Sequence, residues 1–375
     1  MGKHLVLVGG GHAHLTCLKE LKVFIERGHE VTLIGPASHH YYSGMGPGML
    51  GGTYRPQEIR FNILKMAQAA GARFLQGVVV EVRPGEKRLV LASGEEVPYD
   101  VVSFNTGSGI PTHDLPIAPD ANVFTVKPIE QLLKAQKFIR DRLTKKMHHI
   151  LLAGGGPAGL EITGNLVRLA SDLGGRAEIT LVAGRRLMGD FPDKVRSLAL
   201  ASLTERGVKV IEGTRLREVQ TNVAVLQDGR MLPFDMIFLA LGVRPSPLFN
   251  DSGLPTGPDG GLLVNEFLQS VAHPEIFGGG DCIYFQPQPL DKVGVYAVRQ
   301  NPILLHNLQA ALENRVMWRF KPQGAYLLIF NLGNGRAIFR RKQLVFDGPL
   351  AFKLKDYIDR RFMQKFQISG ELEEA

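Results

Sequence analysis

Residues 5–14 read LVLVGGGHAH, a continuous apolar strand that runs directly into a glycine-rich turn. Apolar residues then recur at helical spacing from Leu15 to Ile25, which predicts a helix after the turn. In such a unit Gly9 permits the tight turn, and Gly11 lets the backbone approach a pyrophosphate. The unpaired amides at the start of the helix favour a phosphate. The sequence therefore predicts a dinucleotide site at this turn.

A second copy of the pattern lies at residues 150–161, which read ILLAGGGPAGLE. This copy has a glycine at all three positions of the GxGxxG pattern, whereas His14 takes the third position of the first copy. Each copy is followed by a strand meander that ends in a similar phrase, GEEVPYDVV at 94–102 and GRMLPFDMI at 229–237. The repeat predicts two bound dinucleotides, and a protein that holds two of them face to face usually transfers a hydride between them.

The strands that follow the two turns, 30–34 and 178–182, end at Gly35 and Ala183 rather than at the acid expected of an NAD-selective site. Arg185 and Arg186 come next, and their guanidinium groups could meet the 2′-phosphate of NADP. Solvated surface arginines are the alternative, so the sequence predicts NAD(P)H without choosing between its two forms.

Composition limits the class of protein. At 375 residues with 44% hydrophobic content, the chain is long enough for two or three domains. No signal peptide and no membrane span are recognisable, and Cys17 and Cys282 form no CxxC motif, so a reducing cytoplasm fits best. His12 and His14 are best explained by helix capping and packing, and no metal site is predicted.

The net charge of +8 is concentrated near the end of the chain, where residues 336–365 contain nine basic and three acidic side chains. Apolar residues recur every four positions there, which predicts a basic amphipathic helix. The helix could dock on its own protein, bind an anionic membrane surface on the inner face of the membrane, or join two subunits of a homodimer. No nucleic acid is expected as a partner, because the basic residues lack aromatic interleaving. The stripe comprises Leu350, Leu354, Ile358, Phe362 and Phe366.

Before this helix, residues 326–330 and 336–340 read as a β-hairpin joined through Asn334-Gly335, and residues 369–375 are expected to be frayed. Residues 41–48, YYSGMGPG, are too rich in glycine for a regular element. We expect a loop that wraps the reacting ring of a cofactor, with a plain surface loop as the alternative.

Over roughly residues 4–310, the chain resembles the FAD-dependent pyridine nucleotide-disulfide oxidoreductases. Besides the glycine turns, the resemblance rests on LGVRP at 241–245 and IFGGGD at 276–281. Within that superfamily the chain is similar to type II NADH dehydrogenases and sulfide:quinone oxidoreductases. It is most similar to the flavoprotein module fused to selenophosphate synthetase, through VGGGHAHL at 8–15, SGMGPG at 43–48, GVYAVRQ at 294–300 and KDYIDRRFM at 355–363.

The resemblance implies an α/β fold with two Rossmann-like dinucleotide-binding domains. We expect a discontinuous FAD domain at 1–115 and 250–320, an NAD(P)H domain at 116–249, and a C-terminal unit of hairpin and helix at 321–375. The FAD site would comprise Gly9, Gly11, His12, Ala13, His14, Tyr42, Met45, Pro47, Val79, Thr106, Gly107, Gly280, Asp281, Val295 and Tyr296. The NAD(P)H site would comprise Gly154, Gly156, Pro157, Ala158, Gly159, Glu161, Arg185, Arg186 and Gly242, with Glu161 as the residue that positions the nicotinamide.

The expected reaction passes a hydride from NAD(P)H to FAD and then electrons to an acceptor, for which a quinone is one candidate. By analogy with the quinone phrase of the type II dehydrogenases, the acceptor would lie near Tyr296, Arg299 and Gln300. The chain lacks the close cysteine pair of disulfide reductases, and Cys282 is expected to be a buried, inert thiol. Two alternatives stay open: a reductase of a selenium or sulfur species, and a sensor or assembly protein that binds FAD and NAD(P)H without turnover.

Overall fold

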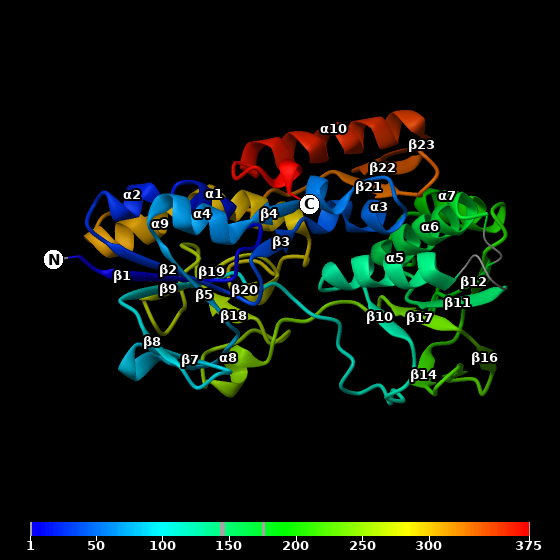
Figure 1. The fold of residues 1–375 in the computed structure, drawn as a ribbon, viewed down its shortest axis with the longest axis horizontal. Helices are drawn as coiled ribbons and strands as arrows, with labels where there is room; N and C mark the ends of the chain where they lie inside the picture. Colours follow the sequence, from blue (N-terminus) through cyan, green and yellow to red (C-terminus); the bar gives the residue numbers. More distant parts are fainter. Residues whose placement is uncertain (1, 143–146, 175–176, 375) are drawn as a thin grey trace.

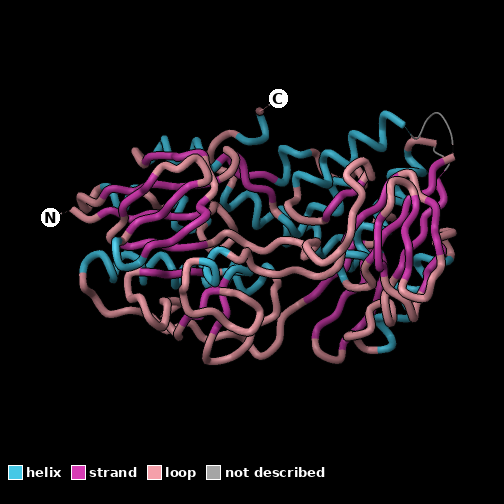
Figure 2. The backbone as a smooth tube through the Cα atoms, turned by 90° about the horizontal axis from the view of Figure 1, so that it is seen from below, coloured by secondary structure: helices cyan, strands magenta, loops and turns pink. Residues whose placement is uncertain are grey.

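The computed structural model describes residues 2–142, 147–174 and 177–374. Two five-stranded parallel sheets lie at opposite ends of an elongated molecule, with helices beside them and long connections between them (Figures 1 and 2). The predicted α/β class with two Rossmann-like units is confirmed.

The first sheet has the strand order β19-β9-β1-β2-β5, and β1 lies at its centre. The apolar run after Lys3 forms β1, whose Leu5 and Leu7 are fully buried, as expected for a parallel strand covered on both faces. β19 joins this sheet only after the chain has built the second sheet. The strands are β1 (His4–Val8), β2 (Glu30–Gly35), β5 (Arg73–Gln76), β9 (Val101–Phe104) and β19 (Ile276–Gly278).

The second sheet repeats this plan with the order β10-β17-β11-β12-β13, and β11 is central. Its strands are β10 (Val123–Thr125), β11 (His148–Ala153), β12 (Ala177–Val182), β13 (Lys209–Ile211) and β17 (Met236–Leu239). The helices associated with it are α5 (Glu130–Arg142), α6 (Pro157–Asp172) and α7 (Asp193–Thr204). Each glycine turn therefore follows the carboxyl end of a central strand.

The two predicted meanders form antiparallel three-stranded sheets. They are β6 (Val79–Arg83), β7 (Arg88–Leu91) and β8 (Glu96–Pro98), and β14 (Leu216–Val219), β15 (Val223–Leu226) and β16 (Met231–Pro233). Two-stranded sheets pair β3 (His39–Tyr41) with β4 (Arg60–Asn62), and β18 (Leu262–Val264) with β20 (Ile283–Phe285). The other helical elements before residue 320 are α1 (Leu15–Lys19), α2 (Lys22–Ile25), η1 (Ser43–Met45), α3 (Gly46–Leu50), η2 (Pro56–Ile59), α4 (Ile63–Ala70), η3 (Pro84–Glu86), α8 (Leu248–Asp251), η4 (Gly280–Cys282) and α9 (Gly294–Glu313).

The single helix predicted over residues 15–25 is wrong, because the structure has α1 and α2 with a break at Glu20 and Leu21. The amide of Val23 bonds to the carbonyl of Glu20, and that of Phe24 bonds to Leu21, each at 3.0 Å. These i→i+3 bonds form a tighter turn than an α-helix allows.

The glycine-rich segment at 41–48 is also more regular than expected, since it contains η1 and all but the end of α3. Its glycines permit close packing. A Cβ at Gly46 would lie 3.1 Å from the Ile129 side chain, and one at Gly48 would lie 2.5 Å from Tyr54. The prediction of an irregular loop was wrong because these glycines serve burial rather than flexibility.

The C-terminal unit consists of β21 (Leu328–Asn331), β22 (Ala337–Arg341), β23 (Leu344–Gly348), α10 (Pro349–Phe366) and η5 (Glu371–Glu373). The predicted hairpin is confirmed, and β23 adds a third strand that the sequence reasoning missed. In Figure 1, α10 lies along the top of the molecule, above β21–β23 and over the central part of the molecule's long axis. The tail is not frayed, because Glu371 is 1% exposed and its carboxylate accepts the amide of Asn62 at 3.1 Å.

The apolar stripe of α10 is only partly packed against the protein. Leu350, Leu354 and Ile358 of the expected apolar face are 76%, 39% and 41% exposed, whereas Asp359 is 4% exposed. Met363 and Phe366 also lie on the packed face. The helix is docked through its charged side as well as its aromatic end, because Lys355 and Asp359 find hydrogen-bond partners inside the protein.

Candidate active site: two glycine turns joined by the C-terminal helix

The second glycine turn borders a cavity of about 710 Å³. Gly154 has φ +134°, and a Cβ there would lie 2.2 Å from the carbonyl oxygen of Ala240, so only glycine fits. A Cβ at Gly159 would lie 1.8 Å from the Gly154 carbonyl oxygen, which explains the third glycine. Gly156 has open space beside it. The amides at the start of α6 thus face a volume suited to a dinucleotide.

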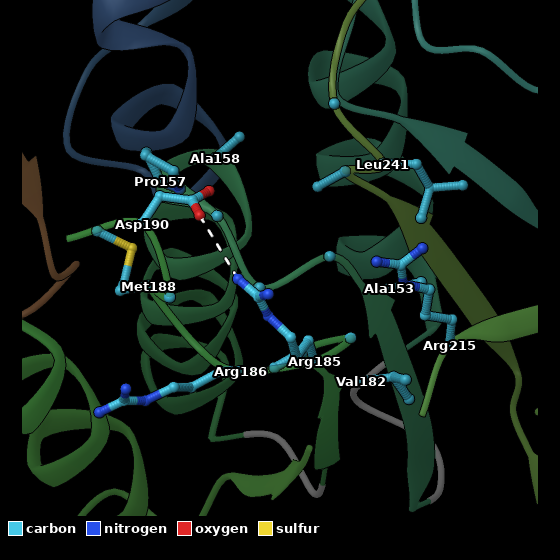
Figure 3. Close-up of a pocket in the computed structure, with 18 of the residues that line it drawn as sticks. Ala153, Pro157, Ala158, Val182, Arg185, Arg186, Met188, Asp190, Arg215 and Leu241 are labelled. Atoms are coloured by element: carbon cyan, nitrogen blue, oxygen red, sulfur yellow. Dashed lines mark ion pairs between the residues drawn. The ribbon is translucent and has the colours of Figure 1, made fainter. Parts of the chain in front are cut away.

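The structure brings most of the predicted NAD(P)H residues to this cavity. Those that line it are Gly154, Gly156, Pro157, Ala158, Arg185, Arg186 and Gly242. Arg215, which the sequence reasoning did not single out, also lines it. Figure 3 shows Arg185, Arg186 and Arg215 extending from different parts of the cavity wall. Gly159 supports the turn from behind.

The first glycine turn is closed by Asn105, which directly follows β9. Gly9 has φ +87°, and a Cβ there would lie 2.4 Å from the carbonyl oxygen of Asn105. The side-chain oxygen of Asn105 accepts the amide of Ala13 at 3.0 Å, and its amide group donates to the carbonyl of Gly279 at 2.6 Å. One asparagine therefore joins the glycine turn to the segment that carries Asp281.

The side chains of His14 and Gln300 form hydrogen bonds within the protein. The two ring nitrogens of His14 lie 2.7 Å from the carbonyl oxygen of Gly9 and 2.7 Å from the hydroxyl of Ser103. Gln300 is 1% exposed, and its side-chain oxygen accepts the amide of Gly280 at 2.7 Å. His14 therefore shapes the turn and Gln300 holds η4, so neither side chain is available to a ligand in this arrangement.

Two histidines beside the first turn have a buried ring nitrogen without a hydrogen-bond partner among the described residues. The Nε2 atoms of His12 and His40 have no hydrogen-bond partner among the described residues, and the two rings lie 5.4 Å apart. Burial lowers the pKa of His12 to about 4 and that of His40 to about 3, so both are neutral at pH 7. Unpaired polar atoms are costly in a protein interior, and two of them side by side favour a polar group bound there.

Asp281 forms a polar cluster with Lys127 and Ser108. Its carboxylate lies 2.7 Å from Lys127 Nζ and accepts the Ser108 hydroxyl at 2.7 Å. Burial alone would raise the pKa of Asp281, but the ammonium of Lys127 and the Ser108 hydroxyl together lower it. The charge of Lys127 also lowers the pKa of His12 and of His40, so the two histidines lie near the Lys127–Asp281 cluster.

The remaining predicted FAD residues are distributed as follows. Met45 is 1% exposed, Val79 begins β6 and is 7% exposed, and Pro47 is buried in α3. Val295 and Tyr296 lie in the first turn of α9 and are half-buried. Thr106 and Gly107 follow Asn105, and Gly107 has φ +71°.

Two of the predicted acceptor residues, Tyr296 and Gln300, border the same small cavity. The cavity bordered by Tyr296 and Gln300 has a volume of only about 10 Å³, which is room for about one water molecule. Arg299 is exposed. Tyr296 stacks edge-on with Tyr326, with ring centres 5.5 Å apart.

Helix α10 links the two glycine-turn regions through buried charges. Lys355 Nζ lies 2.8 Å from the Asp359 carboxylate and donates to the carbonyl of Gly44 at 2.8 Å. The Tyr42 hydroxyl donates to the other oxygen of Asp359 at 3.0 Å. The Phe362 ring lies 4.9 Å from the Tyr42 ring and 6.0 Å from the His12 ring. The sequence pattern assigned Lys355 to the solvated face, so this cluster was missed.

Glu161, in the first helical turns of α6, faces the same cluster. Its carboxylate accepts the amide of Asn331 at 2.7 Å. Burial raises the pKa of Glu161 from 4.5 to about 7, with Lys355 opposing the rise and Asp359 adding to it. Burial opposes the positive charge of Lys355, but Asp359 and Glu161 raise its pKa. Glu161 can therefore hold a proton near neutral pH beside a permanent ion pair.

This pKa predicts a pH-dependent stability. Between pH 4.5 and about 7 the folded protein holds a proton on Glu161 that the unfolded chain releases, so stability falls as pH rises through this window. Glu161→Gln cannot titrate and keeps the oxygen that accepts the Asn331 amide. We expect the free energy of unfolding of the variant minus that of the native protein to rise by about 2 kcal/mol between pH 5 and pH 8. Urea unfolding at both pH values measures this, and a constant difference would contradict it.

The cysteines provide no reactive thiol in this arrangement. Cys17 and Cys282 are both free and fully buried. Burial raises the pKa of the Cys282 thiol, and its sulfur contacts the carbonyl oxygens of Phe104 and Gly279 at 3.4 and 3.3 Å. Both thiols therefore stay protonated near neutral pH.

Known proteins resemble this chain over most of its length. The family model described as pyridine nucleotide-disulphide oxidoreductase matches residues 3–308. The chain is 26% identical to ferroptosis suppressor protein 1 of Xenopus tropicalis over 350 residues, which cover 89% of this chain and 87% of that protein. It is also 26% identical to type II NADH:quinone oxidoreductase of Haemophilus influenzae over 326 residues, 75% and 73% of the two chains.

Among solved structures, NDH2 from Plasmodium falciparum in complex with NADH superimposes with a TM-score of 0.80 at 15% identity. The superposition covers 99% of this chain and 98% of that one, so the shared fold includes the C-terminal unit.

Proposed function

Because the chain belongs to the pyridine nucleotide-disulphide oxidoreductase family, we propose that this FAD-dependent NAD(P)H oxidoreductase passes its electrons to a quinone. The observation that carries the proposal is the pair of glycine turns, each after the central strand of a parallel sheet, joined by the buried charges of α10. The quinone as acceptor is supported by the similarity to a type II NADH:quinone oxidoreductase. The finer likeness to the selenophosphate synthetase-fused module stays a prediction.

The residues at the first turn fit FAD. The unpaired Nε2 atoms of His12 and His40 offer hydrogen bonds to a polar ligand, and the turn at Gly9 and Gly11 leaves no room for side chains. Lys127 and Asp281 would hold the polar part of the cofactor by charge-assisted hydrogen bonds. When bound, FAD supplies the hydride-accepting centre, which no side chain can replace.

The chain's own residues would orient the reactants and manage protons. The cavity at Gly156 would hold NAD(P)H, and its walls would exclude water from the nicotinamide. Glu161 holds a proton near pH 7, and the Lys355–Asp359 pair fixes the field around it. Tyr42 is held by Asp359, so the positions of the groups next to the first turn depend on α10.

The test of this function uses the purified holoprotein. NAD(P)H is mixed anaerobically with it, and bleaching of the flavin band reports the first half-reaction. Steady-state oxidation with a soluble quinone then reports the second. Quinone reduction no faster than with free flavin would overturn the quinone as acceptor, and a selenium or sulfur species would then be screened with the pre-reduced protein. Very slow reoxidation by every acceptor, with nucleotide-dependent association, would support the sensor alternative.

We also propose that α10 binds an anionic membrane surface. Leu350, Leu354, Tyr357 and Ile358 form one stripe at helical spacing and are 39–76% exposed. The exposed cations on the same helix include Arg361 and Lys365, and an apolar stripe beside cations matches the chemistry of an anionic lipid surface. Among the described residues, no helix is both long and apolar enough to span a bilayer.

For membrane binding we expect the protein to cosediment with vesicles containing phosphatidylglycerol but not with vesicles of phosphatidylcholine alone. Leu354→Glu/Ile358→Glu should lower this binding by about tenfold or more, since it puts charge where apolar contact is needed. Met231→Glu is the matched control, because Met231 is 60% exposed and β16 lies across the molecule from α10 (Figure 1). Loss of a dimer in the variant, without vesicle binding by the native protein, would assign the stripe to a homodimer contact instead.

The division into an FAD domain at 1–115 and 250–320, an NAD(P)H domain at 116–249 and a C-terminal unit at 321–375 is part of the proposal. It is supported by the return of β19 to the first sheet. The exposed apolar stripe and the cations of α10 fit a cytoplasmic location, with the protein bound peripherally to the inner face of the membrane.

A further inference from the structure

The end of β12 lacks the carboxylate that selects NADH. In a Rossmann unit an acid at this position bonds the ribose 2′-hydroxyl of NAD. Here the position is Ala183, which is 4% exposed, and its amide donates to the carbonyl of Ile211 at 2.8 Å. Gly184 follows with φ +71° and turns the chain. The small side chain leaves open the space next to a ribose.

Glu212, the first residue after β13, cannot replace the missing acid. Its carboxylate accepts the amide of Leu187 at 2.7 Å and lies 2.8 Å from the guanidinium of Arg196. Both oxygens are therefore used to hold the segment after β12. A ribose hydroxyl would have to share this carboxylate with Leu187 and Arg196.

Two arginines face the cavity without a strong partner. Among the described residues, the ion pair of Arg185 is with Asp190, at 4.0 Å, and the two side chains are 81% and 94% exposed, so this contact contributes little. The Cγ of Arg215 lies 3.9 Å from where a Cβ of Gly184 would be. Within residues 2–142, 147–174 and 177–374 the structure gives Arg215 no ion pair. Arg185 directly follows Gly184, and the side-chain stem of Arg215 passes beside Gly184, so both arginines lie next to the turn after β12.

Arg186 behaves differently from its neighbour. Its guanidinium forms an ion pair with Asp193 at the start of α7, at 2.5 Å. In Figure 3 its side chain extends away from Arg185 and Arg215. Arg186 also lines the cavity, but its guanidinium is paired with Asp193, whereas among the described residues Arg185 and Arg215 have no close ion pair.

We infer that Arg185 and Arg215 bind the 2′-phosphate of NADPH, so that the second site selects NADPH over NADH. This inference rests on the proposed function. A phosphate between two guanidinium groups gains charge-assisted, geometrically matched hydrogen bonds that a ribose hydroxyl cannot form. Asp190 opposes the phosphate only weakly, because it is almost fully exposed to water.

The experiment measures anaerobic flavin reduction and kcat/KM for both nucleotides with an artificial electron acceptor. We expect the native holoprotein to prefer NADPH. Arg185→Ala/Arg215→Ala should lower kcat/KM for NADPH by about 100-fold and leave kcat/KM for NADH within about threefold of the native value. Arg217→Ala is the matched control and should change either value by less than about threefold, because Arg217 is exposed on β14 and is not among the residues that line the cavity.

Calorimetry with 2′,5′-ADP and 5′-AMP gives a readout that does not depend on turnover. The native protein should bind 2′,5′-ADP more tightly, and the double variant should lose this difference. Equal or better use of NADH by the native protein, or a loss in Arg217→Ala as large as in the double variant, would overturn the inference and leave the proposed function standing. No flavin reduction by either nucleotide would overturn the proposed function, while calorimetry would still decide the phosphate site.

Discussion

Lys355→Met is expected to destabilise the protein by about 3–5 kcal/mol, because it leaves a buried carboxylate without its cation. The Lys355 and Asp359 side chains are only 11% and 6% exposed and lie 2.8 Å apart. The same ammonium also donates to the carbonyl of Gly44, so the segment at η1 loses a hydrogen-bond partner. The measurement is the free energy of unfolding in urea at pH 7.5.

The matched control is the double variant Lys355→Met/Asp359→Asn, which removes both charges and keeps a group that can accept the Tyr42 hydroxyl. It should recover more than half of the lost stability, since the cost arises from the unpaired charge rather than from lost packing. Lys353→Met, on the exposed side of α10, should change stability by less than about 0.5 kcal/mol. If Lys355→Met were as stable as the native protein, the buried ion pair would not stabilise the fold as described.

Two neighbouring glycines should respond in opposite ways to the same small substitution. Gly154→Ala should prevent correct folding of the second unit, because the new Cβ would lie 2.2 Å from the Ala240 carbonyl oxygen at φ +134°. Gly156→Ala should fold normally, since φ is −86° and nothing lies within 4 Å of its Cβ. Its methyl group would instead occupy the space next to the dinucleotide phosphates.

For Gly156→Ala we therefore expect an unchanged melting temperature and a KM for NAD(P)H raised by about tenfold or more. The first half-reaction and thermal unfolding, followed on both variants, separate the two effects. A stable Gly154→Ala protein would show that the turn can relax. An unchanged KM in Gly156→Ala would show that the nucleotide does not approach this turn.

Local sequence patterns predicted the sheets and both turns well, because each follows from neighbouring residues. A buried apolar strand, a glycine with positive φ and a helix start lie within about fifteen residues at each turn. The meander phrases at 94–102 and 229–237 likewise specify strands and turns by local chemistry. These features needed no knowledge of distant contacts.

The groups between the two turns could not be predicted this way. Lys355 and Asp359 read as polar residues of an amphipathic helix, yet Gly44 and Tyr42, more than 300 positions earlier, supply their partners. Arg215 reads as an ordinary charge just before β14 and is placed at the cavity only by the fold. The apolar period of α10 left open whether its stripe faces the protein, a membrane or a second subunit, and hydrogen bonds and aromatic contacts determine which side is packed.

The acidic tail has a consequence for the order of assembly. Glu374 lies within 3.0 Å of His39, Arg60 and Lys65, and thereby ties the end of the described chain to β3, β4 and the start of α4. β3 carries His40 and is followed by Tyr42, whose rings surround His12. During synthesis on the ribosome, the first sheet can form long before residue 374 exists. A nascent chain that ends before residue 374 therefore lacks the contacts that hold β3, β4 and the start of α4 in place beside the first turn.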